Sequence, residues 1–112
     1  MTEGIIEFAD LEKVDLRVAE IKEVEEIPGS DKLYKLSVDI GTEMRTICAG
    51  IKPYYEKAQL ENKKIIVVVN LAPRKLLGIT SQGMLLAASN ADHTKVILLS
   101  PEKDIEAGSR VR

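Results

Sequence analysis

The stretch that decides the fold is IIVVVNLAPRKLLGITSQGM, residues 65–84 of a 112-residue chain. Its first five residues, Ile65 to Val69, are all β-branched, which is typical of a central strand buried on both faces. The residues that follow bring amide, guanidinium, ammonium, hydroxyl and thioether groups together. No other segment concentrates so many chemical groups, so the same stretch is the first candidate for a functional site.

Alternating segments upstream predict further strands. In residues 15–25 apolar and charged residues alternate, with a change of phase around residues 19–20 that indicates a bulge or a strong curl. Residues 34–40 alternate cleanly, and Gly41-Thr42 predicts a hairpin with residues 44–48. Curled strands are what a small barrel needs.

Two short helical segments are also predicted. Residues 7–14 repeat apolar side chains three apart, so they form an amphipathic turn that must pack on another surface. Pro53 fits the first turn of a helix that continues over residues 54–60, because its missing amide hydrogen costs nothing there.

A single helix after the third strand favours a small closed barrel over a βαβ sheet, and the OB-fold is the all-β barrel with that arrangement. We expect one domain over residues 1–112, with the barrel over about 8–90 and a C-terminal extension over about 91–112. Because the five strands that such a barrel needs are filled before Val96, the extension must cover an edge of the same subunit or of a partner. The later strands are expected over residues 76–80, 84–88 and 96–99.

The composition predicts a cytoplasmic protein with neither a membrane span nor a secretory signal, since the chain has no apolar stretch of about eighteen residues. The net charge of −2 argues against a general polycation that coats nucleic acid. Residues 1–31 hold ten acids and three bases, whereas residues 32–80 hold nine bases and four acids. A positive face can therefore exist on a net acidic molecule, although lysines also solvate ordinary surfaces.

No group in the sequence has the surroundings that catalysis needs. His93 lies in a polar turn without a Ser or Cys partner, and the glutamates of residues 20–26 fall on the outer face of a strand. Cys48, the single cysteine, has no Cys or His neighbour with which to bind zinc, so we expect a buried, inert thiol. The sequence predicts a protein that is not an enzyme and needs no cofactor or metal.

A small barrel that binds nucleic acid needs cations for phosphates, amides and hydroxyls for sugars and base edges, and polarizable groups for bases. Each candidate also has a structural alternative, such as a turn hydrogen bond for Asn70 or core packing for Met84. Aromatic residues are few, which favours recognition of the shape and backbone of a folded RNA. The candidate residues are Lys32, Arg45, Asn70, Arg74, Lys75, Ser81, Gln82 and Met84.

Four stretches carry a resemblance to a known family. They are Asp15-Leu-Arg-Val-Ala19, Asp31-Lys-Leu-Tyr34, Val69-Asn-Leu-Ala-Pro-Arg-Lys75 and Ser81-Gln-Gly-Met-Leu-Leu-Ala-Ala88. Together they resemble the tRNA-binding OB-fold found at the C-terminus of methionyl-tRNA synthetases and in free-standing dimeric tRNA-binding proteins. The resemblance extends from about Phe8 to the C-terminus.

The resemblance implies a role for most of the candidates. The positions that match Lys32, Asn70, Lys75, Ser81, Gln82 and Met84 line or border the tRNA-binding face in the family. Arg45 and Arg74 are added from charge and adjacency alone, and Arg17 is expected to pair with an acid in the curled first strand. One departure is Ile27, where many relatives have a histidine that can position the turn carrying Lys32.

The partners that the resemblance implies are tRNA, a second copy of the chain through the C-terminal segment, and the catalytic subunit of methionyl-tRNA synthetase. The chain lacks the HIGH and KMSKS signatures, so it is expected to assist such an enzyme and not to activate an amino acid itself. Two alternatives stay open at this point. One is a peptide-binding, secretion-chaperone-like dimer on the same fold, and the other is a dimerisation module without RNA affinity.

Overall fold

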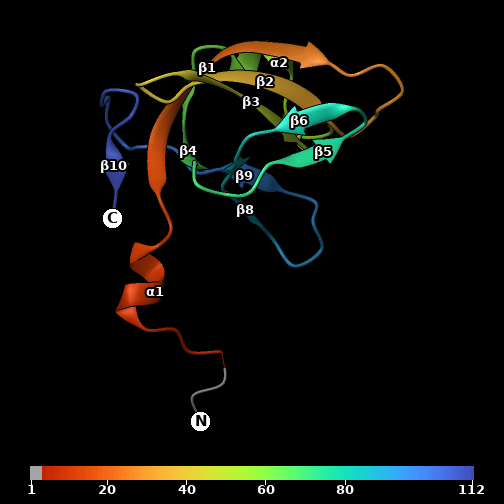
Figure 1. Ribbon diagram of the computed structural model, residues 1–112. Coiled ribbons are helices and arrows are strands. Elements are labelled where there is room, and N and C mark those ends of the chain that lie inside the picture. The colour runs from red at the N-terminus through yellow and green to blue at the C-terminus, as the bar shows by residue number, and fades with distance from the viewer. Residues whose placement is uncertain (1–3) are drawn as a thin grey trace.

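The computed structural model describes residues 4–112, which form a nearly closed barrel of short antiparallel strands with little helix (Figure 1). Neighbouring strands follow the order β3-β2-β1-β4-β7, and β7 comes back beside β3. This is the all-β barrel that the sequence predicts. Its strands are β1 (Leu16–Glu26), β2 (Tyr34–Asp39), β3 (Met44–Ala49), β4 (Lys64–Val68) and β7 (Met84–Leu85).

Strand β1 belongs to both sides of the barrel because it is long and curled. Residues 16–20 pair with β4, and residues 20–26 pair with β2. The register shifts between Ile21 and Glu23, which leaves Lys22 without a partner in β2. The predicted irregularity is therefore present, a little further along the strand than expected.

Side chains close the barrel where β3 meets the segment before β7. Gln82 donates its backbone N–H to the Thr46 carbonyl at 2.7 Å, and its side-chain oxygen accepts a hydrogen bond from the Thr46 N–H at 3.0 Å. The Cys48 N–H donates to the Ser81 hydroxyl oxygen at 3.0 Å. The side chains of Ser81 and Gln82 thus take acceptor positions that a regular ladder would give to carbonyl groups.

The interior of the barrel is apolar and tightly packed. Gly83 lets β7 approach β4, because a Cβ at this position would lie 2.7 Å from the Val68 carbonyl oxygen. Tyr34 is buried, and Cys48 is buried as predicted; burial raises the pKa of the Cys48 thiol. The residues that are less than 1% exposed are Ala19, Ile21, Leu36, Val38, Ile47, Leu60 and Ile65.

Helix α2 (Lys57–Leu60) begins later than the sequence predicted. Pro53 lies in a turn, and the Glu56 N–H at the start of the helix donates to the Gln59 side-chain oxygen at 2.8 Å. This cap begins the helix after the proline and not at it. Within residues 4–112, no helix is long and apolar enough to cross a membrane.

The strand predicted over residues 76–80 is a hairpin instead. Strands β5 (Arg74–Leu76) and β6 (Ile79–Ser81) pair, and Leu77 and Gly78 form the turn between them. Both turn residues have positive φ, 49° and 80°. Such two-residue turns match the twist of the strands, but leucine seldom adopts this conformation. The apolar residues Leu76 and Leu77 therefore favoured a continuous strand in the prediction, and the turn was missed.

The strand predicted over residues 84–88 is interrupted at Leu86. Strand β8 (Ala87–Ser89) leaves the barrel and pairs with β9 (Val96–Leu98) in a separate hairpin. The Leu86 carbonyl accepts a hydrogen bond from the Leu99 N–H at 3.0 Å, at the point where the chain leaves the barrel.

Helix α1 (Phe8–Glu12) projects from the barrel without packing on it (Figure 1). None of its residues is buried, and Phe8 is 72% exposed. The expectation that this amphipathic turn packs on another surface is therefore not met within residues 4–112.

The C-terminal segment covers an edge of the barrel in the same chain. Strand β10 (Arg110–Val111) pairs with the first two residues of β1, and the Gly108 N–H donates to the Val18 carbonyl at 2.7 Å. The segment crosses the β2–β3 turn so closely that a Cβ on Gly108 would lie 2.8 Å from the Ile40 carbonyl oxygen and 2.9 Å from the Gly41 Cα. Two facing glycines make this crossing possible.

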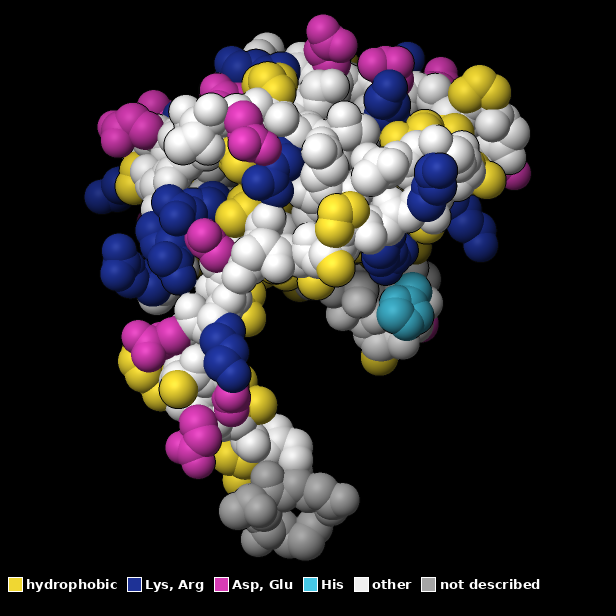
Figure 2. Space-filling view, viewed as in Figure 1, with side chains coloured by type: hydrophobic (Ala, Val, Ile, Leu, Met, Phe, Trp, Pro, Cys, Tyr) yellow, Lys and Arg dark blue, Asp and Glu magenta, His cyan; other side chains and the backbone are white. Residues whose placement is uncertain are grey.

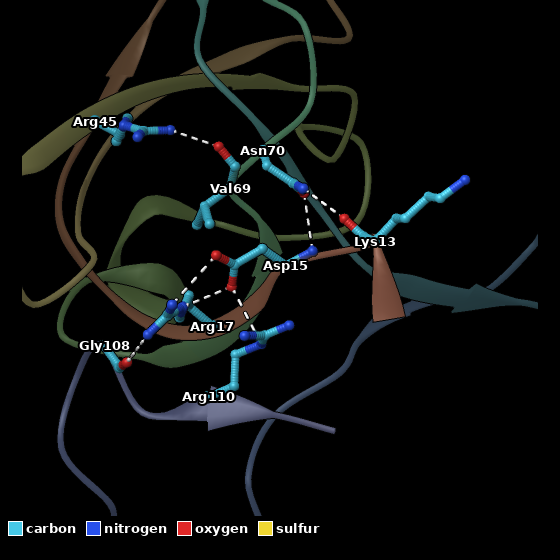
Figure 3. A network of polar contacts seen from close by, with 8 residues as sticks. All are labelled: Lys13, Asp15, Arg17, Arg45, Val69, Asn70, Gly108 and Arg110. Carbon is cyan, nitrogen blue, oxygen red and sulfur yellow. Dashed lines mark hydrogen bonds and ion pairs between the residues drawn. The ribbon is translucent and has the colours of Figure 1, made fainter. Parts of the chain in front are cut away.

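Asp15 joins the C-terminal segment to the start of β1 (Figure 3). Its carboxylate accepts hydrogen bonds from Arg17 at 2.6 and 3.2 Å and lies 3.4 Å from the Arg110 Nε. Arg17 also donates to the Gly108 carbonyl at 3.2 Å. The hydrogen bond from Arg17 is the main reason that the pKa of Asp15 is lowered from its ordinary 3.8. The predicted pairing of Arg17 with an acid is confirmed.

Replacing Gly108 by alanine should destabilise the fold more than replacing Gly29. Both glycines have similar φ, 94° and 84°, but a Cβ on Gly29 meets nothing within 4 Å. We expect Gly108→Ala to lower the free energy of unfolding by about 1–3 kcal/mol more than Gly29→Ala, because only Gly108 adds a steric overlap. Urea denaturation of both variants measures the difference. Equal losses would mean that the C-terminal segment moves aside freely.

The stability that Asp15 contributes should depend on pH. Because its pKa in the folded protein lies below 3.8, the contribution is fully present above this value and is lost as the pH falls through the folded pKa. We expect Asp15→Asn to be less stable than wild type at neutral pH, and the difference to shrink as the pH drops below 3.8. Urea denaturation at several pH values measures it, with Asp31→Asn, an exposed residue without an ion pair among the described residues, as the control. A difference that is independent of pH would contradict the assignment.

Candidate nucleic-acid interface

An open groove of about 790 Å³ lies between the turn before β2 and the β5–β6 hairpin. It is lined by residues from three segments, 29–33, 50–54 and 75–77. Two of the predicted site residues, Lys32 and Lys75, line this groove although they lie far apart in the sequence. Figure 2 shows single Lys and Arg side chains spread over the side of the barrel where the hairpin lies, and a denser group of them beside β10.

The turn that carries Lys32 is held by its own side chains. The Ser30 hydroxyl oxygen accepts hydrogen bonds from the N–H groups of Lys32 and Leu33 at 3.3 and 3.0 Å. Lys52 donates to the Ser30 carbonyl at 3.2 Å through its ammonium group and to the Lys32 carbonyl at 3.1 Å through its backbone. Ile27, at the start of this turn, is buried, with 5% of its surface exposed.

Three cations in the groove or beside it are available to bind anions. Lys32 and Lys75, which line the groove, and Arg74, which precedes Lys75 on β5, are exposed and form no ion pair with other residues of the described part of the chain. By contrast, the hydrogen bond from Lys52 is the main cause that lowers the pKa of Glu26, which Lys57 also contacts. The exposed lysines and arginine of the hairpin side are therefore not held in ion pairs within residues 4–112, although the Asp31 carboxylate also lines the groove.

Arg45 holds the two ends of the hairpin together. Its Nη1 donates to the Val69 carbonyl at 2.8 Å and to the Gln82 carbonyl at 3.1 Å, and its Nε contacts Glu43 at 2.6 Å. Val69 precedes the hairpin and Gln82 follows it. The guanidinium group therefore positions the segment that carries Arg74 and Lys75.

Three of the remaining predicted residues belong to the closure of the barrel or lie beside it. Ser81 is 4% exposed and bonded as described above, and Gln82 spans to β3. Met84 is 37% exposed and borders a hollow of about 10 Å³ with Arg74 and Ser81. This hollow is too small for a ligand.

Asn70 binds the backbone that leads from α1 into β1 (Figure 3). Its side-chain oxygen accepts a hydrogen bond from the Asp15 N–H at 2.8 Å, and its Nδ2 donates to the Lys13 carbonyl at 2.6 Å. The turn hydrogen bond weighed as the alternative for Asn70 is thus replaced by a contact with a distant segment. The residue connects the N-terminal segment to the start of the hairpin.

The predicted residues therefore do not form one cluster. Lys32 and Lys75 meet at the groove, while the others border it, close the barrel or anchor the hairpin. Contact with tRNA stays a prediction for all eight. Tyr54 and Leu77 also line the groove and were missed, because nothing in the pattern of the sequence distinguishes them from ordinary apolar residues. Gly78, as a turn residue, is the one feature of the sequence that could have placed Leu77 in a turn.

The chemistry of this surface is suited to binding. His93 is exposed in a turn with a φ of 57°, as the sequence suggested for a solvated turn residue. Within residues 4–112, no three His, Cys, Asp or Glu side chains lie close enough together to hold a metal ion. Ammonium groups, a hydroxyl-bearing ring and exposed apolar side chains line the groove, and these are groups that contact phosphates and bases.

Comparison with known proteins connects this surface to a family. Residues 16–110 match the family model described as "Putative tRNA binding domain". The methionine–tRNA ligase of Methanocaldococcus jannaschii is 54% identical over 107 residues, which cover 96% of this chain and 16% of the ligase. The chain thus spans a small part of the curated relatives it matches.

Solved structures agree with the fold. The MetRS related protein from Pyrococcus horikoshii has a TM-score of 0.91 and 40% identity, covering 96% of this chain and 98% of that one. The CsaA chaperone protein from Picrophilus torridus has a TM-score of 0.86 and 35% identity, covering 96% and 100%. Because the family model covers most of the barrel and these structures share its fold, the chain belongs to the tRNA-binding domain family.

Proposed function

We propose that this chain binds tRNA through the groove between the turn of Lys32 and the β5–β6 hairpin, mainly by the shape and backbone of the RNA. The observation that carries the proposal is the convergence of Lys32 and Lys75 on one open groove without ion-pair partners among residues 4–112. Such cations bind phosphates without reading sequence. Membership of the tRNA-binding domain family supports tRNA as the ligand.

The proposed role is that of an accessory to methionyl-tRNA synthetase, either as a separate subunit or as a domain. The similarity to part of methionine–tRNA ligases supports this partner. Holding tRNA near a catalytic subunit raises its effective concentration without adding a catalytic contact. Modest, salt-sensitive phosphate contacts also let the charged tRNA leave.

We further propose that two copies associate through α1 and the C-terminal strand. Phe8, Leu11 and Val14 are exposed and border a hollow of about 300 Å³ together with Val111 and Arg110. Figure 2 shows apolar side chains along this projecting segment. Helix α1 also carries acids, and Glu12 and Arg110 border the same hollow, so this surface offers both charges to a second copy across a two-fold interface.

The second candidate function is the capture of unfolded peptide. The similarity to CsaA chaperone proteins favours it, and so do the exposed apolar side chains of α1. This reading places the ligand at α1 and makes Lys32 and Lys75 irrelevant. The two functions are therefore separable by mutation.

Replacing Lys75 by alanine should weaken the binding of all tRNAs about equally. Removing one phosphate contact is expected to lower the slope of log K against log salt concentration by about one unit. Titration of labelled tRNA at several salt concentrations measures this, with Lys103→Ala, an exposed lysine of the C-terminal segment, as the matched control. A loss confined to one tRNA species, or no binding by wild type even at low salt, would contradict the proposal. Binding of unfolded peptide alone would favour the second candidate.

Replacing Leu11 by aspartate should produce monomers. The leucine is 51% exposed in the chain alone, so the substitution should leave the fold intact and place an unpaired charge in the proposed apolar interface. Analytical ultracentrifugation measures the change in mass. Ile97→Asp, at an apolar residue on β9 that is 57% exposed, should leave the mass unchanged. A wild-type protein that is already monomeric at micromolar concentration would refute the dimer.

A further inference from the structure

Tyr54 presents a fixed aromatic ring to the groove. It is 37% exposed and lines the groove with Lys32 and Lys75. Its hydroxyl donates a hydrogen bond to the His93 carbonyl at 3.1 Å, which restrains the orientation of the ring. A ring that is held in place loses little entropy when a flat ligand stacks on it.

Leu77 is held at the groove in an unfavourable conformation. It is 62% exposed, its φ is 49°, and it occupies the first turn position of the β5–β6 hairpin. Turns of this type prefer Asn or Asp before the glycine, because bulky side chains are strained at positive φ. A large apolar residue at this place gains nothing for the fold of the chain alone, and strained residues cluster at binding sites.

We propose that the groove receives one unstacked base of an RNA, held against Tyr54 and Leu77, with the phosphates on either side of it bound by Lys32 and Lys75. This inference rests on the proposed function and adds a ligand subsite to it. The composition of the lining supports it: the ammonium groups of Lys32 and Lys75 and the side chains of Tyr54 and Leu77 line one open groove of about 790 Å³. Base stacking is sequence-tolerant, so the subsite adds affinity while the recognition stays general.

Asp31 is the carboxylate that lines the same groove, and it fits the same occupant. A carboxylate repels phosphates, but it accepts hydrogen bonds from a ribose 2′-hydroxyl or from an exocyclic amino group. A fully paired RNA helix keeps its bases stacked inside and offers no base to the groove. The subsite therefore distinguishes RNAs with an exposed base, such as the loops of tRNA, from uniform duplexes.

The first test uses tRNA and the variants Tyr54→Leu and Tyr54→Phe. Stacking contributes about 1–3 kcal/mol per base, so Tyr54→Leu should weaken binding about 5- to 150-fold with an unchanged salt slope, because no charge is removed. Tyr54→Phe keeps the ring and should bind more tightly than Tyr54→Leu. If Tyr54→Leu binds tRNA as tightly as wild type does, the base subsite is refuted while the tRNA-binding function stands. If wild type fails to bind tRNA, both proposals fall.

The second test separates binding from folding. Leu77→Asn should raise the free energy of unfolding, because asparagine suits the turn, and should weaken tRNA binding, because the apolar contact is lost. Misfolding cannot produce this combination. Ile97→Asn, at an exposed apolar residue outside the groove, should leave tRNA affinity unchanged. A Leu77→Asn variant that is more stable and binds tRNA as well as wild type would overturn the role of Leu77.

The third test compares two RNA duplexes of equal length, each made from two separate strands, one fully paired and one with a single bulged base. Wild type should prefer the bulged duplex, and Tyr54→Leu should bind both equally. Equal binding of the two RNAs by wild type would overturn the base subsite. It would not refute the tRNA-binding function, which the titration with tRNA tests separately. Weaker binding of an unfolded peptide by Tyr54→Leu, with tRNA affinity unchanged, would assign the groove to peptide instead.

Discussion

The structure depends on closing a five-stranded barrel where the backbone ladder is incomplete. Strands β3 and β7 come together, but the hydrogen bonds at this seam are completed by the side chains of Ser81 and Gln82 and by Arg45. Each buried N–H on β3 must find an acceptor, because an unsatisfied one costs about 1–3 kcal/mol. The polar residues that look like a binding motif in the sequence are therefore required first by the barrel itself.

This constraint separates the proposed tRNA-binding face into a frame and free groups. The frame consists of residues whose polar atoms are already bonded within the chain, whereas the free groups are the exposed lysines and the side chains that line the groove. On the proposed function, we expect loss of a frame residue and loss of a free residue both to weaken binding, but for different physical reasons. A frame residue acts through the position of the hairpin, and a free residue acts through its own contact with the ligand.

Much of the barrel could be predicted from the sequence, because alternation of apolar residues reports directly on which side of a strand is buried. In the β-branched run Ile65 to Val69, the first three residues are buried as predicted, whereas Val68 and Val69 are half-buried. Tyr34 lies in the core. One missed feature depends on contacts between distant segments, because the partners of Asn70 lie at residues 13 and 15, and local patterns carry no information about such contacts. Another missed feature is local: helix α2 begins at a cap between Glu56 and Gln59 and not at Pro53.

The seam of the barrel has a consequence for the one thiol of the chain. Cys48 is 2% exposed, and its N–H is bonded to Ser81 across the seam. A buried thiol with a raised pKa reacts with alkylating reagents only while the structure around it is open. Since there is no other cysteine, the rate of alkylation of the native protein reports how often the barrel opens at this seam. The molecule thus contains its own probe of the breathing motion that would loosen the hairpin.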